Sequence, residues 1–123
     1  PQQGYIITAN NAVVDESYPY IITKDWVRGY RAKRIDEIIS NTKSPLSLAD
    51  IQLIQADNLD LNARDLMPIF KSISFDNYVV ENARQLLLSW DFKLEINSPE
   101  SAIFETFWKK LLALTFNDEL PSD

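Results

Sequence analysis

The sequence predicts a mainly α-helical chain with one short strand at its N-terminal end. Three observations predict this fold class. Glycine is scarce, with only 2 among 123 residues. Apolar residues recur at helical spacing, behind helix-start signals, over most of the chain. The apolar run Tyr5–Thr8, by contrast, is short, is preceded by Gly4 and ends near two asparagines, as is typical of a strand.

Composition excludes several classes of function. The chain has 12 basic and 18 acidic residues and a net charge of −6, whereas a nucleic-acid binder normally carries a basic face. No apolar run approaches the ~20 residues that span a bilayer. The absence of Cys removes disulfides and thiolate catalysis. We therefore expect no nucleic-acid and no membrane partner, and the length predicts a single domain.

The predicted strand covers residues 1–11 and ends at Asn10 and Asn11, and a loop over residues 12–22 follows it. A lone strand cannot satisfy its own backbone groups and needs a partner. No second convincing strand follows in the sequence, so the strand is expected to pair with something outside this chain. That expectation favours a segment of a larger protein over a trimmed, self-contained one.

Residues 23–116 are predicted to be helical, with a tail over 117–123. Thr23 is the expected N-cap of the first helix, which runs to about Ser40. Ser47 and Asp50 have the spacing of a capping box at the start of the second helix. Ser98 followed by Pro99 predicts the start of the last helix. The remaining helices are predicted over residues 58–74, where Pro68 is expected to kink the helix or to lie near its first turn, and over 76–90. The helix over 76–90 is expected to place Val79 among its inward-facing apolar residues and to end in a structural corner at Trp90 and Asp91.

Asn10 and Asn11 are the first candidate for chemistry. An asparagine amide can donate a hydrogen bond to an oxyanion without carrying charge, and one such donor can contribute about 3 kcal/mol of transition-state stabilisation. The alternative is that the two residues only turn the chain, since asparagine tolerates left-handed backbone geometry. The dipeptide alone favours the turn.

A basic cluster over residues 28–34 is the second candidate, and it comprises Arg28, Arg31, Lys33 and Arg34. Residues three apart share a helix face, so one of these arginines could bind a carboxylate or orient the asparagine. The alternative is a solvated basic face that balances Asp25, Asp36 and Glu37. The chain has no His, and we find no self-contained catalytic triad.

Taken in order, these segments resemble the penicillin acylase family of N-terminal-nucleophile hydrolases, over a stretch of its catalytic β chain. The resemblance covers nearly the whole chain, and each motif is weak alone but specific in this order. It is carried by Gly4–Asn11, Tyr18-Pro19, Asp25-Trp26, Tyr30–Ile35, Ile51–Asp57, Ala63–Pro68, Leu86–Asp91, Ser101–Phe104 and Trp108.

The resemblance implies a mechanism and a larger αββα fold. In that family an N-terminal Ser, freed by self-cleavage, attacks an amide carbonyl with its own α-amine as general base. The residue matching Asn10 donates to the oxyanion, and Arg34 matches an arginine that lies near that asparagine and the nucleophile. Some members bind a structural calcium, for which Asp25 is the nearest match. No cofactor is required for the chemistry, and the expected location is periplasmic or secreted.

This sequence departs from the family pattern at the nucleophile. Pro1 cannot serve as one, and the family's α chain, which shapes the acyl pocket, is also missing. The implied partners are therefore the α chain, the rest of the β chain and an acylated amide substrate, and the 123 residues alone are expected to be inactive. The substrate could be a penicillin, a cephalosporin or an acyl-homoserine lactone. The alternative is a stand-alone acidic helical module that binds a partner through Trp26, Tyr30 and Trp108.

Overall fold

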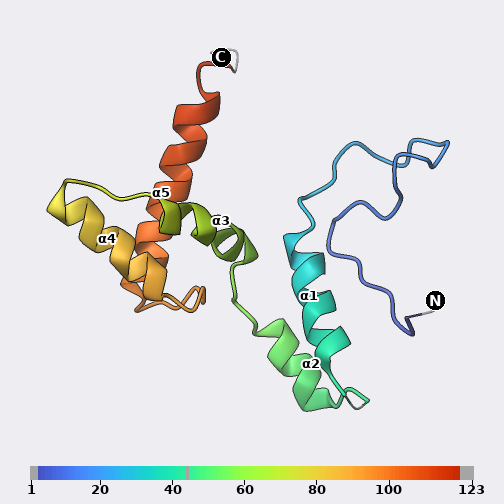
Figure 1. Ribbon diagram of the computed structural model, residues 1–123. Helices are drawn as coiled ribbons and strands as arrows, with labels where there is room; N and C mark the ends of the chain where they lie inside the picture. Colours follow the sequence, from blue (N-terminus) through green and yellow to red (C-terminus); the bar gives the residue numbers. More distant parts are fainter. Residues whose placement is uncertain (1–2, 44, 120–123) are drawn as a thin grey trace. The chain divides into compact units, whose positions relative to one another are not determined.

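The computed structural model describes residues 3–43 and 45–119. Its helices are α1 (Tyr30–Asn41), α2 (Leu48–Gln55), α3 (Leu61–Ser72), α4 (Tyr78–Ser89) and α5 (Pro99–Phe116) (Figure 1). The prediction of a mainly α-helical chain is confirmed. The first two residues of the predicted strand and the last four of the predicted tail lie outside the described residues.

The chain divides into two compact units, residues 1–57 and 58–123. The first unit contains α1, α2 and the irregular segment before them, and the second contains α3, α4 and α5. None of the described helices is both long and apolar enough to cross a membrane.

The predicted strand over residues 1–11 does not form in the part of it that the structure describes, residues 3–11. The only β pairing among the described residues is an isolated bridge between Leu59 and Lys93, in the second unit. Backbone groups of a strand need a partner strand, and the described chain offers none to this segment. It is held instead by polar contacts to the region of α1, of which the hydroxyl of Tyr5 donating to Asp36 Oδ1 at 2.7 Å is one.

The first helix begins at Tyr30, six residues later than an N-cap at Thr23 would predict. The Thr23 hydroxyl accepts a hydrogen bond from the Asp25 amide at 3.1 Å, which is a local turn and not a helix start. The Val27 amide donates to the Asn10 carbonyl at 2.8 Å. Val27 is therefore hydrogen-bonded to the N-terminal segment and is not part of a helix. Helix α1 starts only after Gly29, without a side-chain cap.

The capping box at the start of α2 is confirmed. The Asp50 amide donates to the Ser47 hydroxyl at 3.2 Å, and the Ser47 amide donates to the Asp50 carboxylate at 2.7 Å. The hydrogen bonds from Ser47 lower the pKa of Asp50. Two of the amides that a helix start leaves unpaired are thereby satisfied.

The hydrophobic core lies in the second unit, where α4 packs on α3 and α5. Asp60 caps α3 by accepting from the amides of Asn62 and Ala63. Pro68 lies inside α3 and does not end it. The rings of Phe70 and Phe107 meet edge to face, with centroids 4.9 Å apart. The buried cluster consists of Ala63, Met67, Phe70, Leu87, Trp90 and Phe104.

The end of α4 is a structural corner, as the sequence predicts for Trp90 and Asp91. Trp90 is buried, and its indole nitrogen donates to the Lys93 carbonyl at 3.1 Å. The Ser101 hydroxyl donates to the same carbonyl at 3.0 Å. Val79, expected to face inward on this helix, is 74% exposed, because the buried cluster takes only Leu87 from α4.

Glu81 and Arg84 connect the start of α4 to the end of α3. Two hydrogen bonds join the Arg84 guanidinium to the Glu81 carboxylate, at 2.6 and 2.9 Å. Arg84 also donates to the Phe70 carbonyl at 2.9 Å, and the Phe75 amide donates to Glu81 at 3.2 Å. The hydrogen bonds from Arg84, with those from Gln85 and Phe75, lower the pKa of Glu81 to about 2.

The lowered pKa predicts that acid weakens the second unit through Glu81. A carboxylate whose pKa is lower in the folded state contributes stability above its unfolded value of 4.5 and loses it as the pH falls to about 2. We expect Glu81→Gln to remove the contribution of Glu81 to the pH dependence of the free energy of unfolding. Urea unfolding followed by tryptophan fluorescence, from neutral pH down to about 2, measures it.

The matched control is Glu105→Gln, because Glu105 is exposed on α5. This variant should keep the acid dependence of the unmodified chain. The same loss of stability on acidification in Glu81→Gln and in the unmodified chain would contradict the assignment.

Candidate functional site

The two asparagines at the end of the N-terminal segment have different roles. Asn11 makes the turn, since its Oδ1 accepts from the Ala9 amide at 3.0 Å. Asn10 has a backbone φ of +61°, in the left-handed region that asparagine tolerates better than most residues. The Val27 amide holds the Asn10 carbonyl at 2.8 Å. The turn predicted for the dipeptide is therefore present, and it leaves the side chain of Asn10 exposed.

Arg31 is the side chain that contacts Asn10. Its Nη2 donates to Asn10 Oδ1 at 2.6 Å and to the Ala9 carbonyl at 3.2 Å. Arg31 is in the first turn of α1, so the helix start and the turn at Asn10 are tied together. The predicted basic cluster thus supplies a residue that orients the asparagine, and that residue is Arg31.

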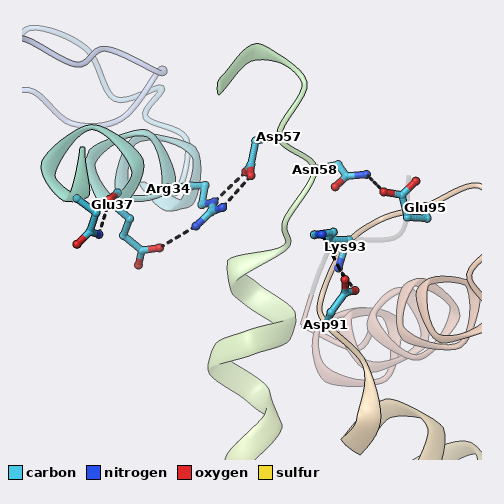
Figure 2. Close-up of polar contacts among 8 residues, drawn as sticks. Arg34, Glu37, Asp57, Asn58, Asp91, Lys93 and Glu95 are labelled. Atoms are coloured by element: carbon cyan, nitrogen blue, oxygen red, sulfur yellow. Dashed lines mark hydrogen bonds and ion pairs between the residues drawn. The ribbon is translucent and has the colours of Figure 1, made fainter. Parts of the chain in front are cut away.

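Arg34 lies one turn further along α1 and makes different contacts (Figure 2). Its Nε and Nη2 donate to the two oxygens of Asp57 at 2.8 and 2.7 Å, and its Nη1 reaches Glu37 at 3.5 Å. The hydrogen bonds to Asp57 raise the pKa of Arg34. The resemblance implies that Arg34 lies near Asn10, whereas in this unit its guanidinium binds Asp57, two residues beyond the end of α2.

Asp57 and Tyr5 belong to this region and were not singled out as site residues. The ion pair of Arg34 with Asp57 spans 23 positions, and the hydrogen bond of Tyr5 with Asp36 spans 31. Neither separation follows a helical or strand period, so no sequence signal could have identified these pairs. The hydrogen bond to Asp36 raises the pKa of Tyr5.

Asp25, the predicted calcium ligand, is exposed in the segment before α1. Within residues 3–43 and 45–119, no three acidic side chains gather closely enough to hold a metal ion. Calcium takes six to eight oxygen ligands. The described residues therefore do not form a calcium site by themselves.

The serine side chains near helices have local structural roles. Ser47 and Ser98 cap α2 and α5, and Ser101 donates to the Lys93 carbonyl. The hydroxyls of Ser47 and Ser98 also donate to the carboxylates of Asp50 and Glu100, at 2.6 and 2.7 Å. Each of these three hydroxyls is therefore engaged in a local contact that holds a helix start or a corner of the chain.

The loop after Asn10 borders a shallow, open hollow of about 620 Å³. A single stretch of chain, residues 12–19 without Glu16, lines it, and most of its side chains are exposed. In the same loop, the ring centroids of Tyr18 and Tyr20 lie 6.0 Å apart. Since one loop alone forms the hollow, it is not a complete substrate pocket.

The three aromatic residues proposed as a binding face do not belong to one unit. Trp26 and Tyr30 are half-buried in the first unit. Trp108 belongs to the second unit and packs against its core. Nothing in the described structure therefore supports a single binding surface made of all three.

Comparison with known families gives one match that covers the whole chain. The family model described as penicillin amidase matches residues 1–123. No solved structure is significantly similar to the chain.

Curated relatives include acylases from several pseudomonads. A penicillin acylase 2 proenzyme from Pseudomonas sp. strain SE83 is 29% identical over 115 residues, which cover 93% of this chain and 15% of that protein. An acyl-homoserine lactone acylase QuiP from Pseudomonas syringae pv. tomato is 26% identical over 134 residues, covering 98% of this chain and 16% of that protein. The chain therefore spans 15–16% of the length of these relatives.

Proposed function

Since the chain belongs to the penicillin amidase family, we propose that it is a segment of a larger amide hydrolase and supplies that enzyme's oxyanion donor, Asn10. The contact between Arg31 and the Asn10 side chain is the main support for this proposal. Arg31 donates to Oδ1 of Asn10, which leaves the amide nitrogen of an exposed side chain to donate elsewhere. The shared membership with acylases supports the reaction class.

The reaction we propose is acyl transfer through an N-terminal Ser that this chain does not contain. The Ser hydroxyl attacks the amide carbonyl carbon while its own α-amine takes the proton. The carbonyl oxygen becomes an oxyanion, and Asn10 Nδ2 donates to it. Collapse breaks the C–N bond, and the amine leaves with the proton. Water then hydrolyses the acyl-serine ester by the same steps.

We propose that Arg34 acts on the site indirectly, by holding helix α1 in place. Its bidentate contact with Asp57, at 2.7 and 2.8 Å, fixes the helix on which Arg31 stands. Bidentate ion pairs between an arginine and a carboxylate are geometrically specific as well as strong. Arg34 thereby influences the position of Asn10 through the helix that carries Arg31.

We also propose the partners, the location and the calcium ligand that the family resemblance implies. The partners are the α chain and the rest of the β chain of the enzyme, in a periplasmic or secreted protein. Asp25 would be one ligand of a structural calcium, with the others supplied by those partners. The substrate is an acylated amide, either a penicillin or cephalosporin type or an acyl-homoserine lactone.

The test compares the complete protein that contains this chain with the 123-residue chain alone, using para-nitroanilides of phenylacetic and decanoic acid. We expect the complete protein to release para-nitroaniline from at least one and the isolated chain to release it from neither, because the chain lacks the nucleophile. Hydrolysis by the isolated chain that Asn10→Ala abolishes would overturn the proposal. So would a complete protein that cleaves no amide.

A further inference from the structure

We propose that Arg31 is a positioning residue that selects which end of the Asn10 amide faces the oxyanion; this inference rests on the proposed function. An asparagine amide has an acceptor end, Oδ1, and a donor end, Nδ2. Only the donor end can stabilise an oxyanion, whereas the acceptor end would repel it. The orientation of this amide therefore decides whether Asn10 stabilises or opposes the transition state.

The guanidinium distinguishes the two ends because it carries only donors. Arg31 Nη2 lies 2.6 Å from Asn10 Oδ1, and a flipped amide would place two donors against each other there. Among the described residues, Asn10 Nδ2 makes no hydrogen bond. Arg31 thus fixes Oδ1 towards the protein and leaves Nδ2 to receive an anion.

Two hydrogen bonds to backbone carbonyls hold Asn10 and Arg31 in place. Arg31 Nη2 also donates to the Ala9 carbonyl at 3.2 Å, and the Val27 amide donates to the Asn10 carbonyl at 2.8 Å. Ala9 and Asn10 are therefore tied to α1 and to the segment that leads into it. The positive charge of Arg31 also polarises the amide, which makes Nδ2–H a stronger donor.

The experiment measures kcat and KM of the complete protein on the para-nitroanilide that it cleaves. We expect Arg31→Gln to lower kcat by roughly ten- to a hundredfold, the size expected for loss of one hydrogen bond to a charged group, with KM little changed. Arg31→Lys should restore part of kcat, because its ammonium can still donate to Oδ1. Arg28→Gln is the matched control, since Arg28 is exposed before α1, and it should keep the unmodified kcat.

A double-mutant cycle separates positioning from a general structural effect. In a protein that already carries Asn10→Ala, Arg31→Gln should cause no further loss of kcat, because the amide it orients is gone. Losses that multiply, or an unmodified kcat in Arg31→Gln, would overturn the role of Arg31 and leave the proposed function in place. Full activity in Asn10→Ala would overturn both.

Discussion

Replacing Asn10 in the complete protein is expected to lower kcat by about 10²–10³-fold, the cost of removing one oxyanion donor. Both Asn10→Ala and Asn10→Asp should lower kcat and leave KM nearly unchanged, since the lost hydrogen bond strengthens only in the transition state. Asn10→Asp is the sharper variant. Aspartate also tolerates the φ of +61° and keeps an oxygen for Arg31, so the backbone and the contact with Arg31 are kept while the donor is replaced by a charged acceptor that repels the oxyanion.

The matched control is Asn41→Ala, at the last position of α1, where the Asn41 amide donates to the Glu37 carbonyl. This variant removes an exposed asparagine of the same unit and should retain the unmodified kcat. An Asn10→Asp protein with unmodified kcat, or one in which only KM rises, would show that Asn10 is not the oxyanion donor.

Phe104→Ala is expected to unfold the second unit. Phe104 is fully buried, and its ring centroid lies 5.7 Å from that of Trp90 and 6.1 Å from that of Phe107. Removing a buried phenylalanine ring costs about 3–5 kcal/mol in lost burial and in the cavity left behind. A unit of this size has roughly 0.05–0.15 kcal/mol of stability per residue, so the loss approaches the whole. Tryptophan fluorescence during urea unfolding measures it.

Leu114→Ala is the control for this substitution, because Leu114 lies on the same helix and is 76% exposed. It should shift the urea midpoint little. Equal shifts for the two variants would mean that Phe104 does not hold α5 to the core.

Helix starts that depend on local side chains could be predicted from the sequence. Ser47 with Asp50, and Ser98 before Pro99, satisfy amides within three residues of themselves. Such contacts need no tertiary partner, so the pattern alone determines them. The corner at Trp90 was predicted for the same reason, since it directly ends a helix with clear apolar spacing.

The N-terminal region could not be predicted because distant contacts decide its structure. Thr23 looks like a helix cap, but the Val27 amide bonds to Asn10, 17 positions earlier, and α1 starts only after that contact. The run Tyr5–Thr8 has strand composition, yet no described segment pairs with it. Strand propensity alone therefore does not determine the structure of this segment in the absence of a pairing partner.

The sequence singles out Asn10 as a candidate donor, but it does not identify the residue that contacts the Asn10 side chain. Asn10 could be singled out because it ends an apolar run and matches a family motif. Arg31 and Arg34 are three apart on one helix, and spacing alone does not say which of them reaches the asparagine. The contacts assign Arg31 to Asn10 and Arg34 to Asp57.

The mass and N-terminal sequence of the native protein, captured from its source cells with an antibody against this chain, decide whether Asn10 belongs to an N-terminal-nucleophile enzyme. The account predicts a polypeptide several times larger than 14.2 kDa that starts with Ser. Such an N-terminus supplies the nucleophile and the base of the proposed reaction. A native polypeptide of about 14.2 kDa would contradict the account, because Asn10 would then have no nucleophile to serve.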